Sequence, residues 1–349
     1  MMQSKLFGGF KFLLLVHKMR LKDIVIGIGS FILGCIITLN FLSLGLNDKP
    51  NVISSDLEIS VKNAKNIKLF SAINYFLIIV IVSAADNFVQ RAAIRNSWGM
   101  WSKDYTDVQY FFIIGSSGLP SDKISKLQKE QIKYNDLFLL SISDNYKTLT
   151  KKVLQAFVWF ESEFNYKYIL KCDDDSFVLI PKVVDELKNK LIKYEDLYWG
   201  YFDGRAHVKQ VGKWKEKNWF LCDRYLPYAL GGGYVLSRSL VHYIKENERL
   251  LGQYLSEDVS VGVWLSPLNI TRKHDVRFDT EYLSRGCNNS YLVTHKQTPE
   301  NMKELYSNIV NTGKLCENEK KTRKFYDYNW KVLPSKCCVP EELKDQTKS

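Results

Sequence analysis

The sequence predicts an α/β protein with a Rossmann-like, mainly parallel sheet flanked by helices, placed behind an N-terminal transmembrane anchor. Three observations predict this organisation. After the N-terminal segment, apolar runs alternate with amphipathic ones, which is the order of parallel strands joined by crossover helices. The apolar run at residues 168–172 stops abruptly at Asp173, Asp174 and Asp175. A run without any charge, residues 24–46, follows a basic N-terminus.

The N-terminal part of the chain predicts a single-pass anchor. As a helix, residues 24–46 would span roughly 34 Å at about 1.5 Å per residue, enough to cross a bilayer. Because positive flanks stay in the cytosol, we expect residues 1–23 to form a cytosolic tail. The polar residues 47–70 are then a stem, and residues 71–349 a luminal domain. The alternative is that the uncharged run is a buried core helix.

The charge of the chain bears on its partners. The formal net charge is +11, which in a luminal domain favours an anionic nucleotide donor or sulfated glycans. We expect the lipid bilayer as a partner through the anchor and no nucleic acid. Two sequons, at Asn269 and Asn288, are possible N-glycan sites if they are exposed.

The seven cysteines also fit a secretory protein. Cys172 lies within an expected core strand, so we expect a buried free thiol there. The neighbours Cys337 and Cys338 should pair with two different partners. The cysteines among which bridges are expected in an oxidising compartment are Cys222, Cys287, Cys316, Cys337 and Cys338.

Hydrophobic periodicity predicts each element in order. Residues 76–83 form a continuous apolar run, which is typical of a strand buried on both faces of a parallel sheet. Asp86 can cap the helix that follows, and Gly99 can end it. The next expected elements are strand 108–114, helix 121–134, strand 136–140, helix 148–164 and strand 168–172. The second half adds helix 181–193, strand 198–201, strand 229–236, helix 237–248 and a late strand at 291–294.

The three aspartates are the first candidate site. They follow a core strand, and ligands of parallel α/β sheets bind at the carboxyl ends of the strands. Bare carboxylates at that depth would be neutralised or would hold a cation. Adjacent oxygen ligands suit Mg²⁺ or Mn²⁺ shared with a phosphorylated substrate. The alternative is a solvated acidic turn.

Glu257 and Asp258 form a second acidic element, in the first turn of a helix for which Ser256 is the expected N-cap. They either complement the helix dipole or supply a general base that removes a proton from a sugar hydroxyl. The helix N-terminus would weaken such a base, whereas the neighbouring apolar side chains would strengthen it by desolvation. The sequence leaves this balance open.

Three further groups are candidates. Gly231, Gly232 and Gly233 can allow positive φ and close approach of a ligand to the backbone, or can form a plain bulge. Arg91 and Arg95, one helical turn apart, could clamp phosphate or lie on a solvated helix face. His295, after the late strand, could be a ligand to the cation held by the aspartates, or a core histidine.

Together these elements resemble the inverting β-1,3-glycosyltransferases of the GT-A type. The likeness runs from about residue 76 to residue 295. The motifs that carry it are RAAIRNSWG (91–99), DNYKTLTKK (144–152), KCDDDSF (171–177), GGGYVLS (231–237) and EDV (257–259). Residues 197–205, 222–230 and 274–282 resemble, within that family, the galactosyltransferases that build the proteoglycan linkage region.

The resemblance implies transfer of galactose from UDP-galactose, with inversion, to a β-galactosyl acceptor on a xylose-primed core protein in the Golgi. Asp258 would be the catalytic base, and Mn²⁺ would be held by Asp175 and His295. Asp173 and Asp174 would contact the ribose or a metal-bound water, Arg91 and Arg95 the nucleotide, and Lys152 a phosphate. The resemblance also places Gly231, Gly232, Gly233 and Glu257 near the donor.

Two other functions remain open at this point. One is a different β-1,3-glycosyltransferase, of the N-acetylglucosaminyl or O-fucose-extending type. The other is a catalytically silent, membrane-anchored glycan-binding protein. A binding protein has no need of both Asp175 and Asp258, so their joint presence favours an enzyme.

Overall fold

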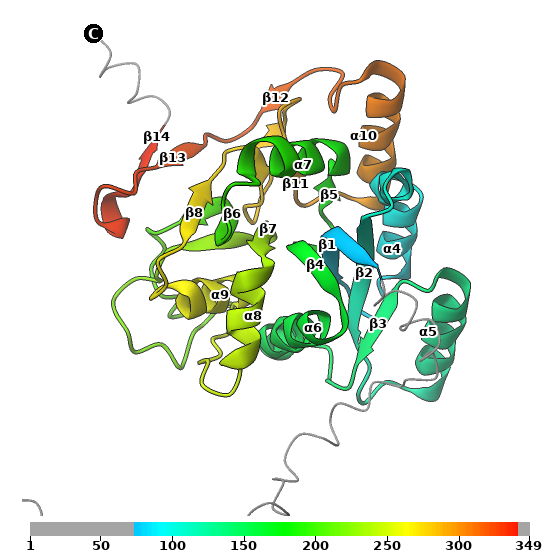
Figure 1. Cartoon of the computed structure of the whole chain (residues 1–349), viewed down its shortest axis with the longest axis horizontal. Coiled ribbons are helices and arrows are strands. Elements are labelled where there is room, and N and C mark those ends of the chain that lie inside the picture. The colour runs from blue at the N-terminus through cyan, green and yellow to red at the C-terminus, as the bar shows by residue number, and fades with distance from the viewer. Residues whose placement is uncertain (1–72, 341–349) are drawn as a thin grey trace, which may run out of the picture. The chain divides into compact units, whose positions relative to one another are not determined.

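The computed structural model of the protein describes residues 73–340. A seven-stranded sheet forms the centre of this domain. Its strands are β1 (Asn74–Val82), β2 (Val108–Gly115), β3 (Leu137–Leu140), β4 (Asn165–Asp173), β6 (Leu197–Asp203), β7 (Tyr228–Ser237) and β8 (Thr271–His274). The strand order is β3-β2-β1-β4-β7-β6-β8. The first four strands in this order run parallel, and β7 is antiparallel to both of its neighbours (Figure 1). The prediction of a mainly parallel α/β sheet is therefore confirmed.

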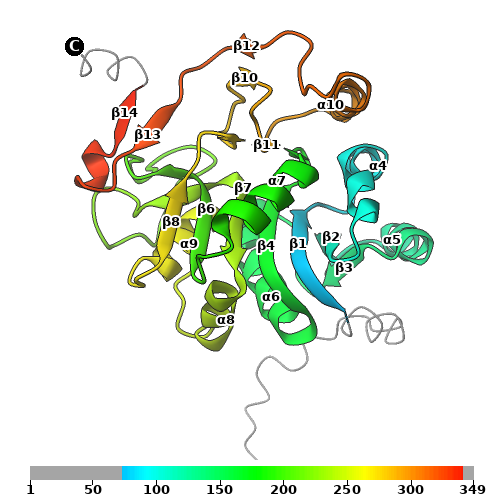
Figure 2. The ribbon, with the colours of Figure 1, turned by 45° about the horizontal axis from the view of Figure 1, so that its top comes forward.

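Helices cover both faces of this sheet (Figures 1 and 2). On one face lie α6 (Leu149–Glu163), α8 (Arg238–Glu246) and α9 (Glu257–Leu265). On the other lie α4 (Phe88–Arg95), α7 (Ile180–Glu186) and α10 (Pro299–Thr312). α5 (Ser121–Tyr134) packs beside the edge strand β3.

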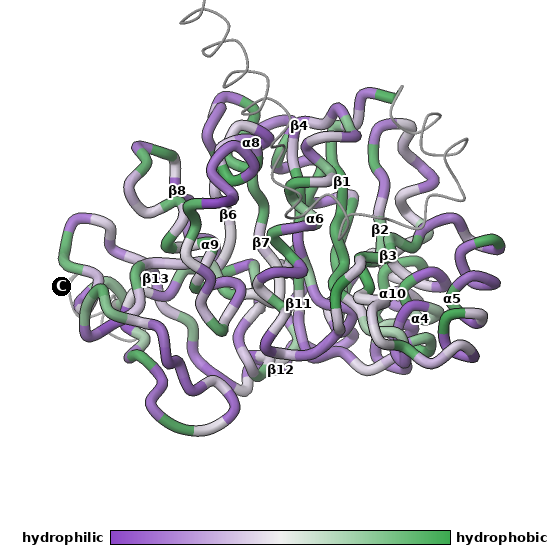
Figure 3. The backbone as a smooth tube through the Cα atoms, turned by 90° about the horizontal axis from the view of Figure 1, so that it is seen from below, coloured by the Kyte–Doolittle hydropathy of each residue, from purple (hydrophilic) through white to green (hydrophobic). Residues whose placement is uncertain are grey.

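The core lies along the central strands. In β1 the residues from Leu77 to Ile81 are all fully buried, because helices cover this strand on both faces. In Figure 3 the hydrophobic colour is continuous along β1, as its sequence NYFLIIVIV requires. Burial of one such aliphatic side chain contributes about 1.5–3 kcal/mol relative to exposure.

Short elements complete the chain and one of them positions the site. A three-stranded sheet has the order β5-β11-β9, and β11 pairs antiparallel with β5 so that Thr294 faces Phe177. Its strands are β5 (Phe177–Val178), β9 (Phe278–Asp279) and β11 (Val293–Thr294). The remaining elements are η1 (Trp98–Asp104), η2 (Tyr146–Thr148), η3 (Leu187–Leu191), β10 (Gly286–Cys287), β12 (Lys320–Lys321), β13 (Tyr326–Tyr328), η4 (Pro334–Lys336) and β14 (Cys338–Pro340). The pairing of β11 with β5 brings His295, the residue after β11, toward the aspartates that precede β5.

Two helix boundaries differ from those expected. α4 begins after Asn87 and ends at Arg95, and a 3₁₀ segment, η1, follows. Asp86 does not cap α4 and instead pairs with Lys123. Gly99 packs against the end of α4, where a Cβ would lie 2.7 Å from the Ile94 carbonyl oxygen. Beyond α7 the expected helix continues as the π-helical segment η3.

The membrane anchor lies outside the described residues. The expected tail, span and stem, residues 1–23, 24–46 and 47–70, therefore stay predictions. Within residues 73–340, no helix has the length and apolar character needed to cross a bilayer.

The disulfides correct one expectation. Cys287 is bonded to Cys316, within the expected set, and Cys172 is a buried free thiol as predicted. Cys337 and Cys338, however, are bonded to each other, so the prediction of two different partners is wrong. Cys222, also in the expected set, is an exposed free thiol.

Candidate active site

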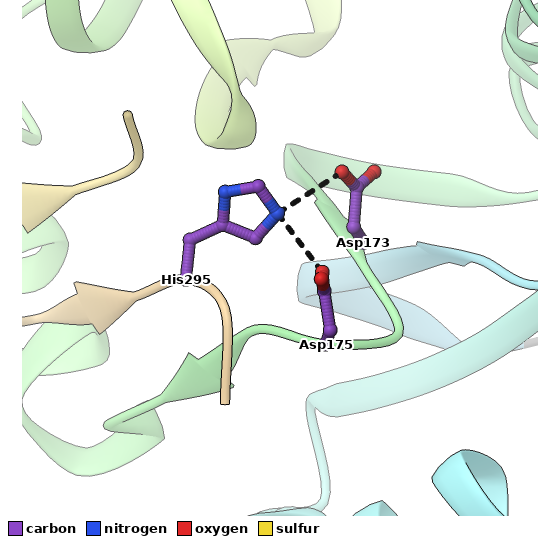
Figure 4. A group of neighbouring side chains, drawn as sticks. All are labelled: Asp173, Asp175 and His295. Carbon is purple, nitrogen blue, oxygen red and sulfur yellow. Dashed lines mark ion pairs between the residues drawn. The ribbon is translucent and has the colours of Figure 1, made fainter. Parts of the chain in front are cut away.

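Two predicted ligands, Asp175 and His295, meet Asp173 at the carboxyl end of β4. Asp173 ends this strand, Asp175 lies in the turn that follows, and His295 follows β11. One ligand atom from each residue lies within 4.8 Å of the other two (Figure 4). The sequence therefore predicted a group that the fold does assemble, although it assigned Asp173 to ribose or a metal-bound water and not to the ligand set.

The imidazole of His295 is oriented for binding a cation. Its Nδ1 lies 3.0 Å from the carbonyl oxygen of Glu281. Its Nε2 lies 2.9 Å from Asp175 Oδ1 and 3.4 Å from Asp173 Oδ2, but makes no well-aligned hydrogen bond to either. When the imidazole is neutral, donation from Nδ1 to a carbonyl leaves the Nε2 lone pair for a ligand, so a bound cation would take the place of the Nε2 proton. The residues present thus fit a divalent cation.

The charges of this group depend on one another. Burial by itself lowers the pKa of His295, but Asp173 and Asp175 raise it to about 9. Burial raises the pKa of both carboxyls, yet Lys171 holds that of Asp173, and His295 that of Asp175, below the usual range. The two carboxylates are therefore ionised and require a neighbouring positive charge.

Asp174 points away from this group. Its buried carboxylate accepts hydrogen bonds from Ser83 Oγ at 2.6 Å and Asn87 Nδ2 at 2.9 Å. Burial raises the pKa of Asp174 to about 6, against the effect of these two donors. Asp174 thus ties the end of β4 to the segment between β1 and α4, and its predicted contact with a ribose or metal-bound water stays a prediction.

Lys171 is a site residue that the sequence reasoning missed. Its buried ammonium group donates to Asp173 Oδ1 at 2.9 Å, Glu257 Oε2 at 2.9 Å and the Gly231 carbonyl at 2.7 Å. Burial lowers the pKa of Lys171, but the two carboxylates outweigh it and raise the pKa above its usual value. A lysine inside an otherwise apolar core strand, two residues before Asp173, was the available signal.

Glu257 and Asp258 begin α9, with Ser256 at the N-cap as predicted. Glu257 is buried and accepts hydrogen bonds from Lys171 and from the Tyr234 hydroxyl. Burial raises the pKa of Glu257 to about 7, against the opposing charge of Lys171. Glu257 therefore holds Lys171 in place, and its predicted contact with a cofactor stays a prediction.

Asp258 has a different environment from that of Glu257. Its Oδ2 accepts from the Gly231 N–H and its Oδ1 from its own helix, at Val259 N–H, both at 2.9 Å. Among the described residues no cation pairs with it directly, and it is only half-buried. Burial raises the pKa of Asp258, against the more distant charge of Lys171. Desolvation thus outweighs the two N–H donors and the charge of Lys171, which favours the general base, one of the two roles that the sequence left open.

The three glycines lie inside β7 and let side chains approach its backbone. A Cβ on Gly232 would lie 2.6 Å from His295 Nδ1, and one on Gly233 would lie 2.8 Å from Val293 Cγ1. None of the three has positive φ, so that part of the prediction is wrong. Their lack of side chains is what lets the imidazole and Asp258 flank the strand.

We expect Gly232→Ala to lower the free energy of unfolding by about 1–3 kcal/mol, the usual cost of overpacking. The new methyl group would displace the imidazole of His295, so affinity for Mn²⁺ should fall as well. Urea unfolding and titration with Mn²⁺ measure the two effects. Gly231→Ala is the matched control, because its Cβ would meet only carboxylate oxygens of Asp258 and Glu257, at 3.2 and 3.3 Å. Equal costs for the two variants would contradict this account.

Arg91 and Arg95 are buried between α4 and α5. Arg91 makes two hydrogen bonds of 2.8 Å to Glu130 and one of 3.1 Å to Ser83 Oγ. Arg95 pairs with Asp136 at 2.7 Å and with Glu130 at 2.7 Å. These contacts join α4 to α5 and β3, so a solvated helix face is excluded. Direct binding of a nucleotide by either arginine stays a prediction.

Lys152 contacts Ser83, in the segment between β1 and α4. Its buried ammonium group donates to the Ser83 carbonyl and pairs with Asp144 at 2.9 Å. Burial lowers the pKa of Lys152, against the charge of Asp144. Arg91 and Lys152 thus both hold Ser83, which in turn donates to Asp174. Contact of Lys152 with a phosphate stays a prediction.

Comparison with known proteins places this site in a known context. A family model described as galactosyltransferase matches residues 89–276, which include the aspartates, the glycines and Asp258. Mouse β-1,3-galactosyltransferase 6 is 44% identical over 271 residues, or 76% of this chain and 83% of the mouse protein. UDP-GalNAc:β-1,3-N-acetylgalactosaminyltransferase 2 of Xenopus tropicalis is 30% identical over 55% of this chain, which spans 39% of that longer protein. Among solved structures, the apo bifunctional glycosyltransferase WbbM covers 58% of this chain and 39% of its own at 14% identity, with a TM-score of 0.34, too low for any conclusion.

Proposed function

Because the chain belongs to the galactosyltransferase family, we propose that it transfers galactose from UDP-galactose to a β-galactosyl acceptor, in β-1,3 linkage with inversion. The likeness to the mouse β-1,3-galactosyltransferase supports the sugar and the linkage. The acceptor that we propose is a galactose-bearing, xylose-primed proteoglycan core protein, so that the product extends the glycosaminoglycan–protein linkage tetrasaccharide. This acceptor is supported by the resemblance of residues 197–205, 222–230 and 274–282 to linkage-region galactosyltransferases.

One observation carries the proposal of turnover over mere binding. The site holds two kinds of carboxylate. Asp173 and Asp175 are ionised and arranged with His295 for a cation, whereas Asp258 is unpaired and has a raised pKa. A transferase needs both, one to hold a nucleotide–metal complex and one to accept a proton. A binding protein has no use for the second.

In the proposed reaction Asp258 accepts the proton of the acceptor 3-hydroxyl. The freed oxygen attacks the anomeric carbon of the donor from the face opposite the leaving group, so the new C–O bond forms as the bond to UDP breaks. The configuration at that carbon inverts. Lys171 holds Glu257 and Asp173 throughout, and thereby holds the base and the cation site in fixed relation.

Mn²⁺ is the cofactor that we propose, with Asp175, His295 and Asp173 as its protein ligands. The two carboxylate oxygens and the Nε2 of the imidazole, which has no hydrogen-bond partner, fit such an ion. When bound, the ion would neutralise negative charge on the departing diphosphate. The choice of Mn²⁺ over Mg²⁺ comes from the family resemblance.

The test of the proposed function is a panel of donors and acceptors. We would incubate the full chain, purified in detergent with Mn²⁺, with UDP-galactose, UDP-N-acetylglucosamine and UDP-N-acetylgalactosamine, and with galactosyl-xyloside or fucoside acceptors. We expect turnover with UDP-galactose and the galactosyl-xyloside, and a β-1,3 linkage in the product. Turnover with another pair would assign another β-1,3-transferase activity. Donor binding without release of UDP would indicate the glycan-binding protein.

For location we propose a single-pass type II Golgi membrane protein, anchored through residues 24–46 with the catalytic domain in the lumen. Protease added to intact Golgi vesicles should then remove an epitope at the N-terminus and spare one at the C-terminus. Asn269 is exposed and Asn288 half-buried, so loss of a glycosidase shift on Asn269→Gln would support the same orientation. Digestion of the C-terminal epitope without detergent would reverse the topology.

A further inference from the structure

A basic, apolar loop stands beside the proposed base. We call residues 209–221, between β6 and β7, the basic loop (Figure 1). Its exposed cationic side chains are Lys209, Lys213, Lys215 and Lys217, none of which forms an ion pair with a described residue. Its exposed apolar side chains are Val211, Trp214, Phe220 and Leu221.

The one acidic residue of the basic loop, Glu216, does not form an ion pair with the exposed lysines. Glu216 is buried, and its Oε1 accepts from the backbone N–H groups of Lys217 and Asn218, at 2.8 and 2.9 Å. Its Oε2 accepts from the Leu255 N–H at 2.7 Å, just before α9. Glu216 therefore fixes the loop beside the N-terminus of the helix that carries Asp258. Within residues 209–221 every exposed charged side chain is a lysine.

Two aromatic contacts connect the basic loop with the site. The Lys213 ammonium group lies 5.0 Å from the ring centroid of Tyr146, whose pKa is raised by burial and by the nearby carboxylates Asp258 and Glu257 of α9. Trp219 packs edge-on against Tyr225, with ring centroids 5.0 Å apart, in a cluster that includes Val259. The loop is thus a rim on the Asp258 side of the site, across β7 from the cation ligands.

We propose that the basic loop binds an acidic peptide segment that flanks the sugar on a glycopeptide acceptor. The inference rests on the proposed function, because an acceptor must reach Asp258 from this side. Unpaired lysines recruit carboxylates, and their number favours several in one segment. The exposed Trp214, Phe220 and Leu221 favour a peptide over a sulfated glycan, because peptide side chains can cover apolar surface.

The test compares three acceptors on the full chain. One is a glycopeptide with aspartate and glutamate flanks, one has asparagine and glutamine in their place, and one is the same sugar on a small aglycone. We expect the acidic flank to lower KM about fivefold relative to the neutral one, because several exposed ion pairs would form together. This preference should shrink toward 1 M salt, because exposed charges are then screened.

Charge reversal assigns the effect to the loop. Lys213→Glu, Lys215→Glu and Lys217→Glu together should abolish the preference for the acidic flank and leave kcat on the small aglycone near normal. The matched control reverses three lysines of α5, at the far edge of the sheet: Lys126→Glu, Lys129→Glu and Lys133→Glu. This control has the same net charge and should keep the preference.

Direct binding separates this proposal from the proposed function. Fluorescence anisotropy of the two labelled glycopeptides reports their affinities even if no sugar is transferred. Absence of transfer to all three acceptors would refute the proposed activity and leave the binding comparison valid. Equal affinity for acidic and neutral flanks would refute the acidic-peptide site. So would loop-dependent binding of a heparin oligosaccharide without any peptide preference, which would assign the surface to sulfated glycans.

Discussion

Replacing Asp258 by asparagine is expected to lower kcat by about 10²–10⁴-fold, the usual contribution of a general base, and to change UDP-galactose affinity little. Asparagine keeps the shape of the side chain and can still accept from the Gly231 N–H. What it loses is basicity, which is needed only as the acceptor oxygen attacks. Steady-state kinetics with the galactosyl-xyloside measure kcat, and titration with UDP-galactose measures donor affinity.

The pH profile gives an independent reading of the same residue. The base must be ionised to act, so kcat/KM should rise with pH through the pKa of Asp258. Burial raises that pKa, so the acid limb should lie above the usual range of an aspartate. In Asp258→Asn this limb should disappear. A variant with near-normal kcat and an unchanged acid limb would leave Asp258 only its role at the start of α9.

Glu257→Gln is the matched control for Asp258→Asn. Glu257 lies one position away and holds Lys171 rather than facing the acceptor. We expect Glu257→Gln to lower the free energy of unfolding, because the substitution removes one charged partner of the buried Lys171 ammonium group. Its kcat should fall less than that of Asp258→Asn. A larger loss of kcat in Glu257→Gln than in Asp258→Asn would contradict the assignment of Asp258 as the base.

The second large effect is expected at the cation site. Asp175→Asn should weaken binding of Mn²⁺ and of UDP-galactose and lower turnover by on the order of 10²-fold or more, because the diphosphate then departs with less charge compensation. Folding should be preserved, since about a third of this side chain is exposed and its partners are His295 and Lys296. EDTA should stop the wild-type enzyme, and Mn²⁺ should restore it.

Asp174→Asn separates the cation site from general damage to the aspartate turn. Asp174 is adjacent in sequence but faces Ser83 and Asn87, so this variant should bind Mn²⁺ nearly as the wild type does. Electron paramagnetic resonance of Mn²⁺ reports binding without reference to activity. Full activity of the wild type in EDTA, or equal loss of Mn²⁺ binding in both variants, would refute the assignment of the ligands.

Much of the fold was readable from the sequence because it depends on local pattern. The apolar runs that became β1 and β4 need no distant partner to be recognised as buried strands. The position of Asp173 and Asp175 at the end of β4 follows from the same pattern, because a core strand cannot carry adjacent carboxylates into the interior. Glycines inside β7 likewise indicated a close approach, although not what approaches.

Other features depend on contacts between segments far apart in the chain, and only the tertiary structure decided them. Pairing of β5 with β11 brings His295 to Asp175, 120 positions earlier. Contacts formed in the folded chain give Lys171 two carboxylate partners, Asp173 and Glu257. They also pair Asp174 with the hydroxyl of Ser83 and not with the candidate cation site.

The sequence alone thus determined the type of fold, the acidic motifs and the family they resemble, since each is encoded in residues close together along the chain. The tertiary structure decided which carboxylates gather around His295, which are paired with Lys171 and which has no cationic partner among the described residues. The physical reason is that the charge state of a buried group depends on its desolvation and on its neighbours within a few ångströms. In this protein those neighbours come from β7, α9 and β11, and no spacing rule brings them together.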